Sequence, residues 1–176
     1  PFSYIKNLEE FDELIQWVKE SGIFVFDYET TGFEYFRKKH KITMLSVSFQ
    51  HGYSYIIPIH HKESWFSEDD IKYIFSVLES EIFSNREVQK VAHNLKFEIH
   101  WTVRYGVKKF CGIFHDTMLM AHLLNELEPI GLKELTKKFF PKFAGYGDQT
   151  AGWDWENQPL EDMAPYGAVD SDMTCR

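Results

Sequence analysis

Several features that would assign this chain to a special class are missing from its sequence. The 176 residues include two cysteines, Cys111 and Cys175, which form no CxxC pair, so a disulfide scaffold is not expected and a reducing compartment is the default. No glycine-, proline- or serine-rich tract is present, which excludes a disordered or fibrous chain. The longest apolar runs, such as residues 23–26, are far shorter than the ~18 residues of a membrane span. We therefore expect a soluble, globular domain without a membrane partner.

Positive charge is also scarce. The chain has 19 Lys and Arg residues and 27 Asp and Glu residues, which gives a formal net charge of −8. A domain of this charge is not expected to grip a long duplex through bulk electrostatics, although it could bind a short stretch of nucleic acid through metal ions. Aromatic residues, in contrast, are plentiful at 17%. Most of these rings should be core, and the others offer flat faces for stacking.

The order of apolar patterns predicts one α/β domain over residues 1–176. Strands are predicted at residues 23–26, 43–50, 53–59 and 88–92. Helices are predicted at residues 8–19 behind the N-cap Asn7, from Ser67 to about Glu79, from about Leu95, at 116–125, at 132–140 and from about Leu160. The first three strands should form a meander, and the helices that follow indicate a mixed sheet flanked by helices. A loop is expected at residues 144–157, long enough to be functional or mobile.

Acidic residues occur at three places where they could hold a cation. Asp27 and Glu29 are two apart at the end of the first predicted strand, so both carboxylates should lie on one face, ~7 Å apart along the backbone. Glu98 falls in the first turns of the helix after the fourth predicted strand, and Tyr166 and Asp170 are four apart on one helical face. Each pattern alone is more often a set of solvated acids or, for the tyrosine, a core residue.

Taken in this order, the three patterns resemble the motifs of a known enzyme superfamily. Asp27-x-Glu29, Asn94-x-x-x-Glu98 and Tyr166-x-x-x-Asp170 are similar to the three motifs of the DEDD 3′-5′ exonucleases, in the branch with tyrosine in the third motif. Five segments also resemble, in register, the proofreading exonuclease domain of family A DNA polymerases of the phage or bacterial DNA polymerase I kind: residues 26–32, 93–97, 115–125, 131–135 and 166–172. The resemblance covers residues 21–176 and implies a ribonuclease H-like fold.

One position departs from the superfamily pattern. The second motif usually ends in Asp, and this chain has Glu98 there. Glutamate keeps the charge and adds a methylene, ~1.5 Å of reach, so it could still hold a metal directly or through water. We interpret Glu98 as a tolerated variant, with weakened activity as the alternative.

The resemblance implies hydrolysis of a phosphodiester with two divalent ions, Mg²⁺ or Mn²⁺, held by four carboxylates. By this resemblance, Asp27 bridges both ions, while Glu29 and Asp170 complete the site that activates water. Glu98 supports the second ion near the leaving 3′ oxygen, and Tyr166 orients the attacking water with Glu29 as its partner. The product is a nucleoside 5′-monophosphate released from a 3′ end.

Four further residues are expected to contact the substrate on the same basis. The Thr30 backbone is expected to bind the terminal 3′-hydroxyl, and Phe33 to stack on the last bases. Asn94 and Phe97 line the same pocket in the family. For Phe33 and Phe97, plain core packing is an equally good interpretation.

The implied substrate is DNA with a single-stranded or frayed 3′ end. By resemblance the chain is a fragment whose last helix leads on to a C-terminal polymerase domain, in the cytoplasm of a bacterium or a phage-infected host. Two other functions fit the same residues: an RNA-trimming exonuclease of the ribonuclease D type, and a degenerate, non-catalytic domain that docks DNA or supports a polymerase. The basic run 37–41 is interpreted as a solvated loop in preference to a DNA contact, and the lysines of the 132–140 helix are likewise interpreted as solvated. Asp116 is interpreted as a helix N-cap.

Overall fold

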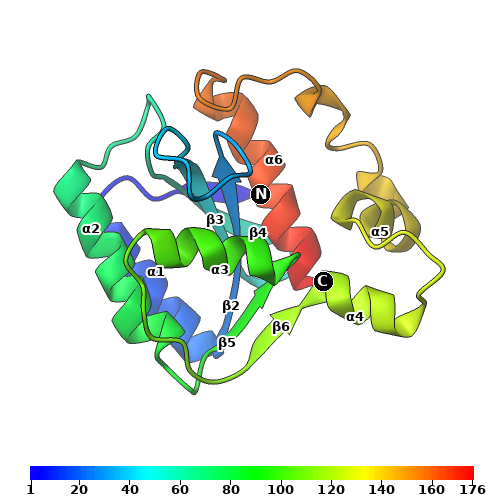
Figure 1. The fold of residues 1–176 in the computed structure, drawn as a ribbon, viewed down its shortest axis with the longest axis horizontal. Helices are drawn as coiled ribbons and strands as arrows, with labels where there is room; N and C mark the ends of the chain where they lie inside the picture. Colours follow the sequence, from blue (N-terminus) through cyan, green and yellow to red (C-terminus); the bar gives the residue numbers. More distant parts are fainter.

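A six-stranded mixed sheet forms the centre of the computed structural model, which describes residues 1–176 (Figure 1). The strands are β1 (Phe2–Tyr4), β2 (Ile23–Thr30), β3 (Ile42–Gln50), β4 (Tyr53–Pro58), β5 (Gln89–Ala92) and β6 (Phe114–Asp116). The helices are α1 (Leu8–Ser21), α2 (Glu68–Val77), α3 (Leu95–Arg104), α4 (Thr117–Leu124), α5 (Leu132–Phe139) and α6 (Leu160–Cys175). Three short helical segments complete the chain: a π-helix η1 (Leu78–Phe83) and the 3₁₀ turns η2 (Pro141–Phe143) and η3 (Asp148–Thr150).

The strand order across the sheet is β1-β4-β3-β2-β5-β6. The pairs β2/β3 and β3/β4 are antiparallel, which confirms the predicted meander, and the other three pairs are parallel. The predicted mixed sheet flanked by helices is thereby confirmed. The sequence did not predict the edge strands β1 and β6, because three residues are too few to show an alternating pattern.

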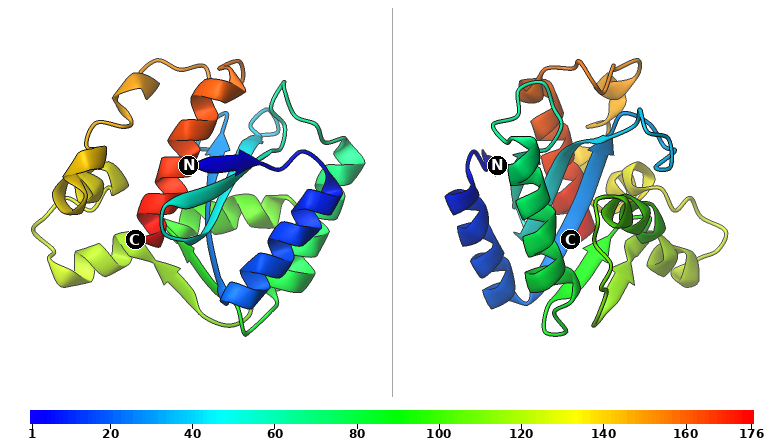
Figure 2. Two further views of the ribbon diagram at one scale, coloured as in Figure 1. Left: turned by 180° about the vertical axis from the view of Figure 1, so that it is seen from behind. Right: turned by 60° about the vertical axis from the view of Figure 1, so that its left-hand side comes forward.

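Side chains of β2 alternate between two different environments. Phe24, Phe26 and Tyr28 point into the larger core, which α1, α2 and α3 cover. Figure 2 shows α1 and α2 side by side on this side of the sheet, away from α6. The period of two therefore turns Asp27 and Glu29 to the opposite face, on which α6 packs.

Predicted helix starts agree with the structure. The Asn7 side chain accepts a hydrogen bond from the backbone N–H of Glu10, and Ser67 forms a capping box with Asp70. The predicted end of the second helix, about Glu79, lies two residues beyond the end of α2 at Val77. The helical turns continue as η1, because Leu78, Ile82 and Phe83 there are all buried in the core.

The helix α6 lies close against the sheet because small residues face it. A Cβ added to Gly167 would lie 2.6 Å from the Met44 side-chain Cε and 3.7 Å from Glu29 Oε1, so there is no room for a larger residue. Ala164 and Ala168, on the same helical face, pack with Met44 in a second, smaller core. The glycine therefore sets the distance from α6 to the end of β2.

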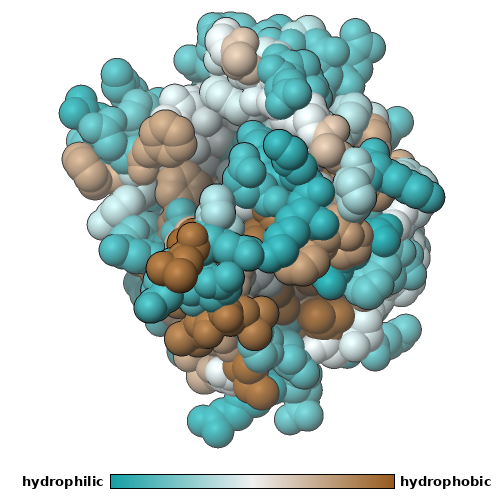
Figure 3. Space-filling model, turned by 90° about the vertical axis from the view of Figure 1, so that its right-hand side faces the viewer, coloured by the Kyte–Doolittle hydropathy of each residue, from teal (hydrophilic) through white to brown (hydrophobic).

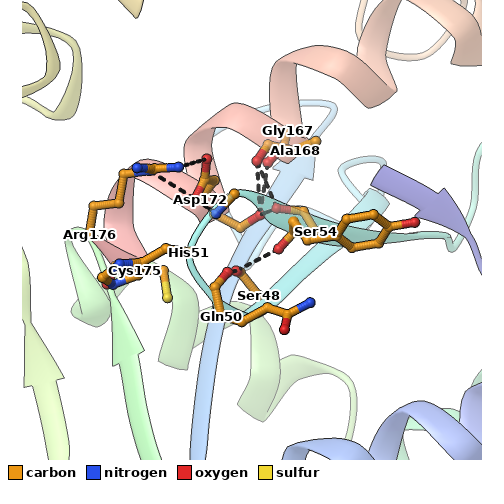
Figure 4. Close-up of polar contacts among 12 residues, drawn as sticks. Ser48, Gln50, His51, Ser54, Gly167, Ala168, Asp172, Cys175 and Arg176 are labelled. Carbon is orange, nitrogen blue, oxygen red and sulfur yellow. Dashed lines mark hydrogen bonds and ion pairs between the residues drawn. The ribbon is translucent and has the colours of Figure 1, made fainter. Parts of the chain in front are cut away.

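Polar contacts hold the C-terminal part of α6 to the β3–β4 hairpin (Figure 4). The backbone N–H of Gly52, in the hairpin turn, donates to Asp172 Oδ1 at 2.7 Å. His51 Nε2 lies 3.1 Å from the Cys175 carbonyl oxygen, and the Ser54 hydroxyl donates to a third acceptor on the helix, the carbonyl of Ala168, at 2.8 Å. These contacts fix both the position and the rotation of the helix that carries Tyr166 and Asp170.

The side of the molecule that carries α4 and α5 leaves apolar residues exposed. Figure 3 looks at the side that carries α4 and α5 and shows brown, apolar side chains gathered in its lower half. The helix α4 has no buried residue, and the large apolar side chains exposed on and next to it are Leu119, Met120, Leu123, Leu124 and Leu127. No helix of the structure combines the length and the apolar content that crossing a bilayer requires.

We predict that Gly167→Leu destabilises the fold. The added side chain has to displace Met44 and approach Glu29, and overpacking of this kind costs about 1 to 3 kcal/mol. Gly167→Ala should cost less, because the first obstacle is the end of a flexible methionine. Thermal unfolding of the three proteins measures the difference; equal midpoints for Gly167→Leu and the unmodified chain would show that α6 does not depend on this close approach.

Candidate active site

Three carboxylates meet where β2 ends under α6. Asp27, Glu29 and Asp170 each offer an oxygen atom, and these atoms all lie within 4.8 Å of one another. Glu29 and Asp170 are buried, and Asp27 is partly exposed. Like charges this close repel strongly in a partly buried site, so the cluster is arranged to hold a cation or protons.

The fourth predicted acid, Glu98, lies beside this group but is not part of it. Its Oε2 accepts a hydrogen bond of 3.0 Å from the backbone N–H of Tyr28, so the carboxylate is tied to β2 between the other two acids of that strand. Thr102, one turn along α3, donates to the Glu98 carbonyl and contacts the Tyr28 hydroxyl. Glu98 is therefore held rigidly at the site wall.

The start of α3 is fixed by a neighbouring strand. Asp116, at the end of β6, accepts hydrogen bonds from the backbone N–H groups of Asn94 and Leu95 at 3.0 and 2.9 Å. The same side chain accepts from Met118 N in the first turn of α4, which confirms its predicted role as a helix N-cap. Asn94 has a left-handed backbone with φ of 62°, and this sharp turn directs α3 across the end of the sheet toward the acids.

Tyr166 lies one turn before Asp170 on α6, inside a cluster of rings. The centroids of Tyr146, Trp153 and Trp155 lie 5.7 to 5.9 Å from that of Tyr166. These three residues belong to the segment predicted as a loop, residues 144–157, which in the structure contains the short turn η3 and folds over the first half of α6. The Tyr166 ring is therefore buried and held in one orientation.

A cavity of ≈ 370 Å³ lies over the acids. All but one of the predicted site residues line it: Asp27, Glu29, Phe33, Asn94, Phe97, Glu98, Tyr166 and Asp170. Thr30 does not, because the strand register shifts between Glu29 and Thr30 and the Thr30 hydroxyl donates to the Gly32 carbonyl. Its predicted backbone contact with substrate remains a prediction.

The two phenylalanines differ in their surroundings. Phe33 is 87% exposed at the mouth of the cavity, which rules out core packing for this residue. Phe97 is partly buried, and its ring packs edge-on toward Phe33 and Trp101, so it belongs both to the core and to the cavity wall.

Two cavity residues that contact Asp170 or Tyr166, namely Tyr146 and Lys133, were not among the predicted site residues. The Tyr146 hydroxyl donates a hydrogen bond to Asp170 Oδ1, and Lys133 Nζ lies 4.9 Å from the centroid of the Tyr166 ring. Lys133 is the only lysine or arginine in the cavity lining. Its place in the 131–135 segment was a usable signal, whereas nothing in the sequence distinguishes Tyr146 from a core aromatic residue.

Burial and mutual repulsion raise the pKa values of the acids. Desolvation, with a contribution from the Asp170 charge, raises the pKa of Asp27 to about 8. Desolvation raises the pKa of Asp170 to about 6, although the Tyr146 hydroxyl and the Lys133 charge act in the opposite direction. The pKa values of Glu29 and Glu98 are well above the usual range, mainly from burial and then from Asp27. Burial and the neighbouring acids also raise the pKa of the Tyr166 phenol.

The donor set fits a hard divalent cation. It consists of carboxylate oxygens, which Mg²⁺ and Mn²⁺ prefer, with no nitrogen or sulfur ligand among the three clustered residues. Glu29 Oε1 is also buried without a hydrogen-bond partner, which is costly unless something else binds that atom. The site can therefore hold a cation through Asp27, Glu29 and Asp170.

Comparisons with known proteins agree with this arrangement. A 3′-5′ exonuclease family model matches residues 2–176. The DNA polymerase I of Chloroflexus aurantiacus is 23% identical over 185 residues, which cover 100% of this chain and 19% of the polymerase. The chain thus spans about a fifth of the length of that curated relative.

Two solved structures show the same fold. The catalytic core of RRP6 from Trypanosoma brucei has a TM-score of 0.74 at 13% identity, over 99% of this chain and 44% of that one. Escherichia coli RNase D, an exoribonuclease involved in structured RNA processing, has a TM-score of 0.71 at 13% identity, over 98% of this chain and 42% of that one. The predicted ribonuclease H-like fold is confirmed.

The raised pKa values predict how stability depends on pH in the absence of metal. Unfolded carboxyl groups titrate near pH 4, whereas folded Asp27 and Asp170 titrate near 8 and 6. The folded chain therefore binds more protons between these values, and its stability falls as the pH rises from about 4 to 8. Asp27→Asn, which cannot ionise, should gain about 1 to 3 kcal/mol relative to the unmodified chain between pH 5 and pH 8.

Thermal melts of both proteins in a chelator, at intervals from pH 5 to pH 8, measure this effect. Added Mg²⁺ or Mn²⁺ should stabilise the unmodified chain most at the upper end of the range, because a cation replaces the bound protons. A difference in melting midpoint between the two proteins that stays constant from pH 5 to pH 8 would contradict the assigned pKa of Asp27.

Proposed function

Since the chain belongs to the 3′-5′ exonuclease family, as its motifs predicted, we propose that it removes nucleoside 5′-monophosphates from the 3′ ends of DNA. The observation that carries this proposal is the cluster of Asp27, Glu29 and Asp170 beside Tyr166 in an open cavity. Hydrolysis of a phosphodiester needs positive charge where the attacking and leaving oxygens become negative. Clustered carboxylates with few lysine or arginine side chains beside them are suited to bind metal ions that supply this charge.

We propose four ligands for two Mg²⁺ or Mn²⁺ ions. Asp27, which clusters with Glu29 and Asp170, is the candidate ligand shared by both ions, and Glu29 and Asp170 would complete the site of one of them. Glu98, held against the β2 backbone, is the candidate ligand of the second ion, directly or through water. Bound ions of this kind lower the pKa of water and stabilise the developing charge.

Tyr166 is proposed to orient the attacking water. Its phenol has a raised pKa and therefore stays protonated at neutral pH, so it cannot act as a general base. A hydroxyl fixed by surrounding rings can instead hold a water molecule through a hydrogen bond. Glu29 Oε1, which has no partner within the protein, is available to accept a hydrogen bond from the same water.

The remaining cavity residues are proposed to bind the 3′-terminal nucleotide. Phe33 offers an exposed ring for base stacking, and Phe97 and Asn94 form the adjoining wall. Lys133 supplies the amino group of the cavity, and we expect it to contact a nonbridging oxygen of the scissile phosphate. The Thr30 backbone is the proposed contact for the 3′-hydroxyl.

We propose DNA in preference to RNA as the substrate, because a sequence relative is a DNA polymerase I. On this basis, the chain is proposed to be the proofreading exonuclease domain, residues 1–176, of a protein with a C-terminal polymerase domain. RNA trimming is the second candidate, and the fold likeness to RNase D, an exoribonuclease, favours it.

The two candidates predict different results with matched oligonucleotides. We expect faster release of mononucleotides from single-stranded DNA than from single-stranded RNA of the same sequence, in Mg²⁺ or Mn²⁺, and none in a chelator. Faster cleavage of RNA would favour the second candidate. No release from either polymer would indicate a non-catalytic domain.

Asp27→Ala tests the site itself. Loss of the proposed shared ligand should lower the rate at least ~10³-fold, because several kcal/mol of transition-state stabilisation depend on the cations it would hold. Asp69→Ala, on the exposed start of α2, is the matched control and should cleave like the unmodified chain. Trimming by Asp27→Ala at a near-normal rate would overturn the site assignment.

Tyr166→Phe separates water positioning from metal binding. The variant keeps the ring and its packing and loses only the hydroxyl, so single-turnover cleavage should slow roughly 10- to 10³-fold. Metal affinity should stay nearly unchanged, whereas Asp170→Ala, one turn away, should weaken it. Metal titrations and single-turnover kinetics of both variants test this; loss of metal by Tyr166→Phe equal to that of Asp170→Ala would refute the proposed role.

A further inference from the structure

The loop between β2 and β3, residues 31–41, is fastened to α3 by one side chain. The Arg104 guanidinium donates to three loop carbonyls, those of Tyr35, Arg37 and Lys38. The Tyr35 ring also lies 4.4 Å, centroid to centroid, from the His100 ring one turn earlier on the helix. These contacts hold the loop in a fixed position alongside α3, which is not expected of a loop that is merely solvated.

Two exposed aromatic rings lie along this loop, beginning at the mouth of the cavity. Phe33 stands at the mouth of the cavity, and Phe36, 70% exposed, comes one step further along the loop. Phe36 packs edge-on against Tyr35, at 5.6 Å between centroids, which leaves most of its own surface open. Exposure of large rings in water is unfavourable unless a partner covers them, and single-stranded bases are suitable partners.

Positive charge is concentrated in the same place. Residues 31–41 carry four Lys and Arg side chains and one acid, in a chain whose net charge is −8. Arg37 is paired with Glu34 and Lys41 with Glu156, whereas Lys38 and Lys39 form no ion pair. These two lysines are therefore available to bind an anion.

Two adjoining hollows lie on this strip. One, of ≈ 320 Å³, is lined by Tyr35, Phe36, Lys38, His100, Val103 and Arg104. The other, of ≈ 420 Å³, shares Lys38 and Arg104 with the first and adds mainly polar residues. From Phe97 in the catalytic cavity to Arg104 is seven residues of helix, about 10 Å, which matches two or three nucleotides of a single strand.

We propose that this strip, Phe33, Phe36, Lys38 and Arg104 along α3, binds the nucleotides on the 5′ side of the one being removed. Bases stack on Phe33 and then on Phe36, and the phosphates lie by Lys38, with Arg104 adding charge and holding the loop. The strip rests on the proposed function for one point, that the 3′ end lies in the catalytic cavity. It explains how an acidic domain can hold a polyanion: the cavity binds the end, and a local basic surface binds the strand.

Binding of oligonucleotides of increasing length tests the strip without relying on catalysis. In an Asp27→Ala background, which prevents degradation, fluorescence anisotropy with single-stranded DNA of two to eight nucleotides should show affinity that rises up to about four or five nucleotides. Phe36→Ala should weaken the longer complexes about 5- to 100-fold and leave the dinucleotide unaffected. Lys38→Ala should reduce the slope of log affinity against log salt by about 0.7, the value for one phosphate of a single strand.

Matched controls lie elsewhere on the surface. Phe139→Ala removes another exposed ring and Lys109→Ala another exposed lysine, and neither should change the length dependence. In the catalytically intact chain, Phe36→Ala and Lys38→Ala should lower kcat/KM for an octanucleotide and not for a dinucleotide.

Two outcomes distinguish failure of the strip from failure of the proposed function. Affinity independent of length, or variants that bind octanucleotides like the unmodified chain, would overturn the strip even if 3′ ends are cleaved normally. Length-dependent binding that Phe36→Ala and Lys38→Ala remove would support the strip even if no cleavage is found, and only the catalytic proposal would then fail.

Discussion

Repulsion among buried carboxylates is the constraint on which the rest of this structure depends. Asp27, Glu29 and Asp170 bring oxygen atoms within 4.8 Å of one another, and Lys133 is the one nearby ammonium group. Two like charges at this separation repel by about 1 kcal/mol even in water and by more in a partly buried site. The acids stay together because the apolar face of β2 and the packing of α6 supply the stabilisation elsewhere. The site therefore weakens the metal-free fold, and this is the physical reason that it suits a cation.

The helices α3 and α6, which carry the remaining site residues, are each held in place by one aspartate side chain. For α3 the aspartate belongs to a neighbouring strand, and for α6 it lies near the end of the helix itself. Asp116, at the end of β6, receives the first N–H groups of α3 and so fixes the place of Glu98. Asp172, near the end of α6, receives the N–H of Gly52 in the hairpin turn (Figure 4) and so fixes the helix that carries Asp170. Neither Asp116 nor Asp172 lines the catalytic cavity. The geometry of the acids is therefore set by neighbouring contacts that do not have to change when a ligand binds.

Much of the fold could be predicted because local patterns determine local geometry. An alternation of two along β2 placed Asp27 and Glu29 on one face, opposite the rings of the large core. Helix starts could be predicted from single side chains such as Asn7 and Asp116, since an N-cap needs only its own helix to act. Edge strands of three residues and the π-helical extension of α2 could not be predicted, because pairing or burial against distant segments decides them.

For the site, the sequence by itself determined which residues carry charge and which share one face of an element. Only the tertiary structure decided the distances between elements: that Asp170 meets the two acids of β2, that Glu98 is held apart by the Tyr28 N–H, and that Tyr146 donates to Asp170. Residue spacing fixes direction within one helix or strand, because the backbone repeat is regular. The separation of two elements instead depends on the side chains packed between them, and no spacing along the chain encodes that.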